Sequence, residues 1–223
     1  MTSGAQRTTL ILVRHGESRW NAEGRVQGHC DSSLTPRGRA EMQKLAERLA
    51  SKDIAAVYSS DAGRARESAE LIAAPHGLTV NVHQALRERC YGVLEGKTLE
   101  EAARDETGWL QAWRGDRLRL APPEGETQPE MSQRVMAALR EITAAHPGHT
   151  VAVATHGGPI KSAVFHILQI PVSSWDLTWV ANGSITILRG TPDLMRVAAF
   201  NDTAHLDEEP TPTWRTSDIG RES

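Results

Sequence analysis

The stretch Thr9-Leu10-Ile11-Leu12-Val13-Arg14-His15-Gly16-Glu17-Ser18-Arg19-Trp20-Asn21 decides the fold. Four consecutive large apolar residues, two of them β-branched, predict a strand that is buried on both faces, and such strands belong to largely parallel sheets. The strand ends where Arg14 and His15 stand side by side. Because open α/β sheets bind ligands at the carboxyl ends of their strands, we expect an anion to bind there.

A second strand ends in a similar way. Residues 150–154 form an apolar run, and Thr155-His156-Gly157-Gly158-Pro159 follows it. The carboxyl ends of parallel strands lie on the same edge of a sheet, so His15 and His156 can face one ligand although they are far apart in the chain.

The remaining pattern alternates strands with helices. Thr35 suits a helix N-cap and Pro36 the first helical position. Residues 59–61, Ser-Ser-Asp, are expected to cap the helix that carries Arg64 in its first turn. Further strands are expected at 54–58, 78–82, 184–188 and 195–200, and further helices at 127–145 and 160–168. This order predicts an α/β protein with three α/β/α layers around a mostly parallel central sheet.

The composition bounds the class of protein. A net charge of −3 and a pI near 6.3 argue against a general nucleic-acid binder. Cys30 and Cys90 lack ligand spacing, so we expect free thiols and no metal site. The short polar N-terminus and the lack of a long apolar run predict a cytoplasmic protein that does not bind membranes.

The chain length fits one domain, 1–206, with an insertion at about 97–128. This insertion is polar but carries tryptophans and arginines, and we expect it to act as a helical lid that sets specificity. Packing of the tryptophans within the insertion is about as well supported as contact with a ligand. Residues 207–223 are acidic and polar, and a disordered tail is predicted.

Three motifs carry a family resemblance: Arg14-His15-Gly16, the run from Ser59 to Ala69 and the run from Leu86 to Gly96. Together they resemble the histidine phosphatase superfamily, the clan of cofactor-dependent phosphoglycerate mutases and related phosphatases. The resemblance covers about 10–206, nearly the whole chain, and implies a phosphoglycerate mutase-like fold.

The resemblance also implies roles for single residues. His15 would be the nucleophile, with Arg14 and Arg64 as phosphate clamps, His156 as a donor to the phosphoryl oxygens and Glu88 as general acid and base. Glu95 is the competing carboxylate. The positions that match substrate or phosphate contacts in the family are Asn21, Gln27, Gly28, Arg89 and Gly157.

These residue types suit phosphoryl transfer without a metal or other cofactor. Arginine binds phosphate as a bidentate fork, and two arginines disfavour the imidazolium form of His15, which must be neutral to attack. A bound phosphate then helps Glu88 to hold the proton that a leaving oxygen needs. The expected partner is a small phosphorylated metabolite. Whether the chain forms a homodimer is open.

Three functions fit this pattern. The favoured one is a metal-independent phosphomonoesterase that uses a phosphohistidine. The second is a 2,3-bisphosphoglycerate-dependent phosphoglycerate mutase, but Leu99 and Gly115 stand where mutases carry cations, and Gly158 follows the phosphatase-like form. The third, a phosphate-binding sensor or scaffold without activity, is disfavoured because both His15 and Glu88 are present.

Overall fold

A six-stranded sheet forms the centre of the protein, whose computed structural model describes residues 6–104 and 108–206. The strand order is β3-β2-β4-β1-β5-β6, so β1 lies inside the sheet. β1 pairs in parallel with β4 and antiparallel with β5. The bounds are Thr8–Arg14 for β1, Ile54–Ser59 for β2, Val80–Val82 for β3, Thr150–Thr155 for β4, Ile185–Gly190 for β5 and Met195–Asp202 for β6. The predicted mostly parallel sheet is confirmed.

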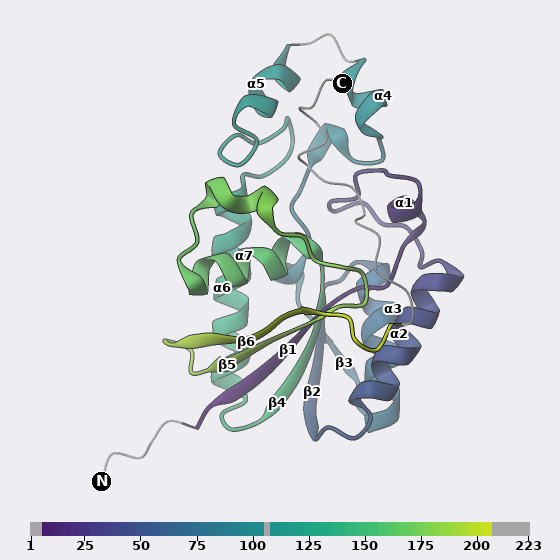
Figure 1. The fold of residues 1–223 in the computed structure, drawn as a ribbon, viewed down its shortest axis with the longest axis vertical. Coiled ribbons are helices and arrows are strands. Elements are labelled where there is room, and N and C mark those ends of the chain that lie inside the picture. Colours follow the sequence, from purple (N-terminus) through teal and green to yellow (C-terminus); the bar gives the residue numbers. More distant parts are fainter. Residues whose placement is uncertain (1–5, 105–107, 207–223) are drawn as a thin grey trace.

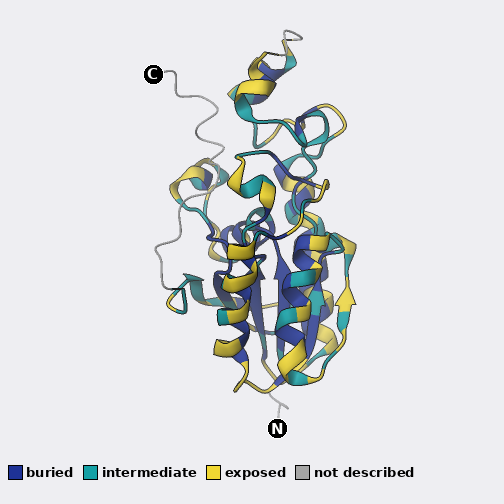
Figure 2. Cartoon of the chain, turned by 90° about the vertical axis from the view of Figure 1, so that its right-hand side faces the viewer, coloured by how far each residue is buried: buried dark blue, intermediate teal, exposed yellow. Residues whose placement is uncertain are grey.

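Helices cover both faces of this sheet, which gives the predicted three layers (Figure 1). The longer helices are α2 (Pro36–Leu49), α3 (Gly63–Ala73), α6 (Gln128–Ala145) and α7 (Gly157–Leu168). Ile11 and Val13 of β1 pack in the cluster with residues of α2 and α3, whereas Leu10 and Leu12 pack with residues of α6 and α7. Because successive side chains point to opposite faces, an unbroken apolar run buries both sides of β1. Figure 2 shows the resulting buried centre in dark blue.

The observed helix starts agree only in part with those predicted from the sequence. Thr35 caps α2 as predicted and accepts a hydrogen bond from the Gly38 N–H. At α3 the prediction was wrong, because the residue at the cap is Ala62 and has no side-chain hydrogen bond. The carboxylate of Asp31, from a distant loop, accepts the N–H groups of Gly63 and Arg64 instead. This helix start is therefore satisfied across the tertiary structure.

The insertion forms a small unit beyond the carboxyl ends of the parallel strands (Figure 1). It contains α4 (Leu99–Ala103) and α5 (Trp109–Gly115). These helices have a core of their own, built from Val26, Leu94, Ala102, Leu110 and Trp113. The chain from 21 to 28, predicted as loop, begins inside a short helix, α1 (Arg19–Ala22).

Two further expectations concern the C-terminal tail and membrane-spanning helices. The predicted tail, 207–223, lies outside the described residues. Among the residues that are described, no helix is both long and apolar enough to cross a membrane.

Candidate active site

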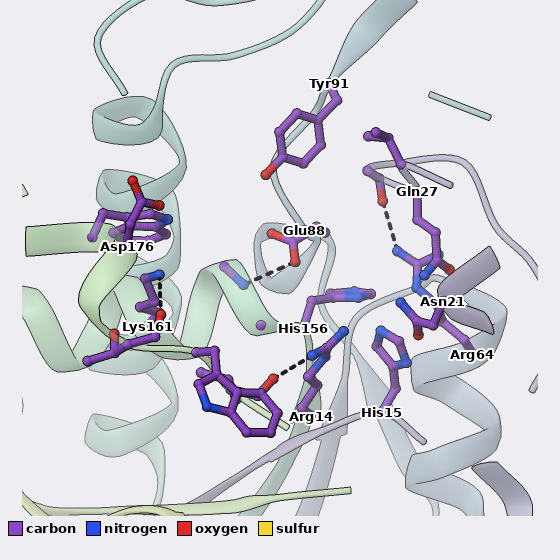
Figure 3. Close-up of a pocket in the computed structure, with 18 of the residues that line it drawn as sticks. Arg14, His15, Asn21, Gln27, Arg64, Glu88, Tyr91, His156, Lys161 and Asp176 are labelled. Carbon is purple, nitrogen blue, oxygen red and sulfur yellow. Dashed lines mark hydrogen bonds between the residues drawn. The ribbon is translucent and has the colours of Figure 1, made fainter. Parts of the chain in front are cut away.

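A pocket of about 250 Å³ opens where β1 and β4 end, and most of the predicted site residues line it (Figure 3). The pocket brings together nine of them: Arg14, His15, Asn21, Gln27, Gly28, Arg64, Glu88, His156 and Gly157. The predicted common edge of the two histidine-bearing strands is therefore observed.

The surroundings of His15 favour a neutral imidazole. Its Nδ1 lies 2.8 Å from the Gly16 carbonyl oxygen, which can only accept, so Nδ1 carries the proton. Burial lowers the pKa of His15 well below 6.5, and the charges of Arg64 and Arg14 lower it further. Nε2 therefore keeps its lone pair, as a nucleophile requires.

His156 lies edge-on to His15, with 5.1 Å between the ring centroids. Its Nε2 is 2.9 Å from the Ser60 hydroxyl oxygen, and its buried Nδ1 has no hydrogen-bond partner among the described residues. Burial lowers the pKa of His156 well below 6.5, and so do the nearby positive charge of Arg64 and the His15 ring. Such a ring can offer a hydrogen bond to a bound anion.

Two arginines, Arg64 fully buried and Arg14 partly buried, supply positive charge to the pocket. Burial lowers the pKa of Arg14 to about 10, and one of its Nη atoms donates to the Val180 carbonyl. Arg64 is fully buried and donates to the Gly28 and Cys30 carbonyls at 2.8 Å and to Asp31 at 2.9 Å. Its Nε has no partner within 6–104 and 108–206. Unsatisfied buried donors are costly, so the site favours an anionic ligand.

Two amides complete the side of the pocket next to Arg64. Oδ1 of Asn21 accepts hydrogen bonds from the Ser18 N–H and from Asn182, both at 3.2 Å. Oε1 of Gln27 accepts one from the Ser18 hydroxyl at 2.9 Å. Because both oxygens are engaged by protein groups, the NH₂ groups are left to face a ligand. The supporting residues Ser18 and Asn182 were not found from the sequence, where neither stands in a catalytic pattern.

The two competing carboxylates have different surroundings. Glu88 lines the pocket, and its oxygens accept the N–H groups of Arg89 at 2.8 Å and Gly158 at 3.0 Å. In Figure 3 the Tyr91 hydroxyl is directed toward Glu88. Arg134 of α6 fixes the segment by donating to the Glu88 carbonyl oxygen at 2.7 Å. Glu88 is therefore the carboxyl group that can reach a ligand.

Glu95 has a structural position. Its carboxylate accepts the N–H groups of His29, Cys30 and Tyr91, at 2.8–2.9 Å. Burial alone would raise the pKa of Glu95, but these donors lower it below its usual value. The carboxylate also occupies the space beside Gly28, where a Cβ would lie 2.1 Å from Oε1, so this turn requires glycine. An ionised group with three N–H donors is a poor proton donor.

Arg89 is the one predicted contact that the structure does not bring to the pocket. Its guanidinium is buried and donates to three carbonyl oxygens of the insertion: Arg117 at 2.7 Å, Glu126 at 2.8 Å and Leu120 at 2.9 Å. Arg89 thus anchors the insertion. Its proximity to Glu88 in the sequence gave no sign of this packing.

The sequence also missed one wall of the pocket. Lys161 of α7 lines it together with Trp175, Leu177 and Trp179, which belong to a 3-10 helix (Val172–Leu177) and the segment after it. No described residue of 97–128 lines this pocket, contrary to the expectation that the insertion sets specificity. The available signal was Lys161 itself, a single cation in the apolar helical run from Pro159 to Phe165.

The described residues also bear on metal binding. Within 6–104 and 108–206, no three His, Cys, Asp or Glu side chains are grouped so that they could hold a metal ion. The independence of metals stays a prediction that an assay has to test.

Comparisons with known proteins agree with this geometry. The family model of the histidine phosphatase superfamily (branch 1) matches residues 10–203. A probable phosphoglycerate mutase GpmB from Salmonella arizonae is 37% identical over 214 residues, covering 89% of this chain and 94% of the relative. Bacillus stearothermophilus YhfR has a TM-score of 0.82 at 35% identity, covering 89% of this chain and 98% of that one. The mycobacterial glucosyl-3-phosphoglycerate phosphatase Rv2419c has a TM-score of 0.77 at 29% identity, with coverage of 88% and 99%.

Proposed function

Because the chain belongs to branch 1 of the histidine phosphatase superfamily, as its motifs predicted, we propose that it is a metal-independent phosphomonoesterase. It hydrolyses small phosphorylated metabolites through a phosphohistidine on His15. The chemistry needs no cofactor, and the proposed location is the cytoplasm.

In the first half-reaction, Nε2 of His15 attacks phosphorus and the bond from phosphorus to the ester oxygen breaks. Arg14 and Arg64 neutralise the phosphoryl oxygens, and His156 donates a hydrogen bond to one of them. Protonated Glu88 gives its proton to the departing oxygen, so the alcohol leaves neutral. General acid assistance of this kind contributes about 100- to 10,000-fold.

In the second half-reaction, ionised Glu88 removes a proton from water, which attacks the phosphohistidine. The N–P bond breaks, the electron pair returns to Nε2 of His15, and inorganic phosphate leaves. Glu88 keeps the proton and is ready for the next ester. The amides of Asn21 and Gln27 hold the phosphoryl oxygens during both steps.

The observation that carries the proposal is the tautomer of His15. The Gly16 carbonyl holds the proton on Nδ1, at 2.8 Å, and so leaves Nε2 as the nucleophilic atom. Two arginines and a second histidine line the same pocket. A binding protein without activity would need the anion site but not this poised nitrogen next to a carboxyl group.

The phosphoenzyme can be trapped directly. We expect rapid quenching in base, followed by mass spectrometry, to find one added phosphoryl group on His15, since phosphoramidates survive base and decay in acid. His15→Ala should give no adduct and no turnover of p-nitrophenyl phosphate. His149→Ala, a change at an exposed histidine outside the pocket, is the matched control and should behave as wild type. An unmodified His15 during turnover, or full activity of His15→Ala, would refute the mechanism.

A phosphoglycerate mutase is the second candidate, favoured by the name of the Salmonella relative. A mutase must keep the phosphohistidine from water until a second hydroxyl accepts the phosphoryl group. We therefore expect little interconversion of 3- and 2-phosphoglycerate when 2,3-bisphosphoglycerate primes the enzyme, and net release of phosphate from monoesters. Isomerisation much faster than hydrolysis of every monoester tested would reverse this assignment.

A further inference from the structure

A cation outside the phosphate clamp faces the same pocket. Lys161 lies on α7, three residues after Gly158, which places it about one turn, roughly 4.5 Å, further along the helix. The residue is 8% exposed, and its ammonium group donates to the Thr178 carbonyl oxygen at 2.8 Å. The ammonium also lies 4.4 Å from the centroid of the Trp175 ring. These contacts fix its position and leave ammonium hydrogens for another acceptor.

The groups around this lysine leave part of its charge uncompensated. Asp176 is the acidic group whose charge acts most strongly on Lys161, but that carboxylate already pairs with Arg117 of the insertion. Burial lowers the pKa of Lys161 to about 8 and the charge of Arg117 lowers it too, although Asp176 and Glu88 oppose this shift. The cost of keeping a buried ammonium charged falls when an anion binds beside it.

A second donor lies at the same place. The buried Oγ1 of Thr178 has no hydrogen-bond partner among the described residues, and Thr178 also lines the pocket. Its backbone carbonyl holds Lys161, so the hydroxyl and the ammonium belong to one local structure. In Figure 3, Lys161 and Asp176 lie on the opposite side of the pocket from Arg64 and Gln27. A ligand whose phosphate is clamped at His15 would therefore extend toward Lys161.

We propose that Lys161 and Thr178 form a carboxylate subsite that selects the leaving group of the ester. The substrate class is a phosphate monoester whose alcohol or phenol has an apolar body that ends in a carboxylate. The apolar body would lie against Trp175, Leu177 and Trp179. The effect on kcat/KM rests on the proposed phosphatase activity. Binding at the subsite does not, because it needs no turnover.

A carboxylate fits this subsite better than a second phosphate. Lysine is a compact point charge, and the cation Arg117, whose charge also acts on Lys161, is paired with Asp176. Glu88 is also close enough to influence Lys161. A second phosphate would thus bring a double negative charge to one ammonium, with the carboxylate of Glu88 nearby.

The test compares 4-carboxyphenyl phosphate with 4-carbamoylphenyl phosphate, in which an uncharged amide replaces the carboxylate. Lys161→Met keeps an unbranched side chain against Trp175 but removes the charge, and Lys161→Arg keeps the charge. We expect Lys161→Met to lower kcat/KM for the carboxylate ester about 10- to 100-fold, mainly through KM. The carbamoyl ester and p-nitrophenyl phosphate should stay within about threefold of wild type. Lys161→Arg should restore part of the preference. Lys52→Met, at an exposed lysine, should change neither ester.

Two further measurements separate this inference from the proposed function. Calorimetric titration of both esters into His15→Ala measures the Kd preference without turnover, and Lys161→Met in that background should abolish it. The wild-type preference should also decline as pH rises through about 8, while Lys161→Met should show no such decline. If no ester is hydrolysed but the Kd preference depends on Lys161, the proposed function fails and the subsite stands. An equal loss for both esters, or a preference unchanged in Lys161→Met, overturns the subsite.

Discussion

Replacing Gly158 by alanine should separate the proton donor from the nucleophile. A Cβ on Gly158 would lie 2.0 Å from Oε1 of Glu88 and 3.2 Å from Sδ of Met131. Since real Cβ contacts lie beyond 3.0 Å, the Glu88 carboxyl group has to move by about 1 Å, and its 3.0 Å bond with the Gly158 N–H is disturbed. The three atoms nearest to the added Cβ belong to Glu88 and Met131, not to His15 or an arginine.

The magnitude follows from the role of the displaced group. A misplacement of about 1 Å costs roughly 100-fold, and the whole contribution of a general acid is about 100- to 10,000-fold. We expect Gly158→Ala to lower kcat for glycerol phosphate about 100-fold or more, because an alkoxide needs the proton. For p-nitrophenyl phosphate, whose leaving group is stable as an anion, the loss should stay below about tenfold.

Folding should be little affected by this change. Glu88 lies at the pocket, and alanine is favoured over glycine inside a helix by about 0.5–1 kcal/mol. Thermal unfolding should therefore show a Tm within a few degrees of wild type. Gly115→Ala is the matched control, since no atom lies within 4 Å of the added Cβ, and it should hydrolyse both esters normally. Equal losses for the two esters in Gly158→Ala would show that Glu88 is not the proton donor.

Two other predictions test the neighbouring groups. Glu95→Gln should lower the free energy of unfolding by about 1–3 kcal/mol in a urea titration, because a carboxylate that accepts three N–H groups is lost, and it should slow aryl and alkyl esters equally. A selective loss of alkyl ester hydrolysis would instead make Glu95 the acid in place of Glu88. Below about pH 6.5 the unfolded chain protonates His15 and His156 while the folded chain keeps them neutral, so the free energy of unfolding should fall with decreasing pH, by up to about 1.4 kcal/mol per pH unit for each histidine. His15→Gln should lose its share of this slope between about pH 5 and 7, and a slope as steep as that of wild type would contradict the buried neutral state.

The phosphate end of the pocket could be predicted because its residues follow regular elements. Arg14 ends β1 and His15 follows it, His156 comes directly after β4, and Arg64 lies in the first turn of α3. The positions of these side chains are set by strand pairing, which an apolar run announces in the sequence. The same regularity explains why both histidines were expected at one edge of the sheet, where they line one pocket.

The failures involve residues whose partners are distant in the chain. Asp31 caps α3, more than thirty residues away, and Arg89 holds carbonyls of the insertion. Neither contact follows a periodic pattern, so nothing in the local sequence distinguishes a buried structural arginine from one that binds substrate. The competition between Glu88 and Glu95 was likewise decided only by which backbone N–H groups each carboxylate meets.

The wall around Lys161 explains why the leaving-group end escaped prediction. Its residues follow α7 in a 3-10 helix and an irregular segment, where apolar side chains have no period that marks a buried face. The insertion was expected to set specificity because it carries tryptophans, but Trp113 is buried in the core of that unit. The insertion reaches the pocket wall indirectly, through the pair between Arg117 and Asp176. Since the side chains of the phosphate clamp come from other elements, side-chain changes in residues 172–179 can alter the specificity for the leaving group without disturbing His15. Selectivity and chemistry are thus separable in this protein.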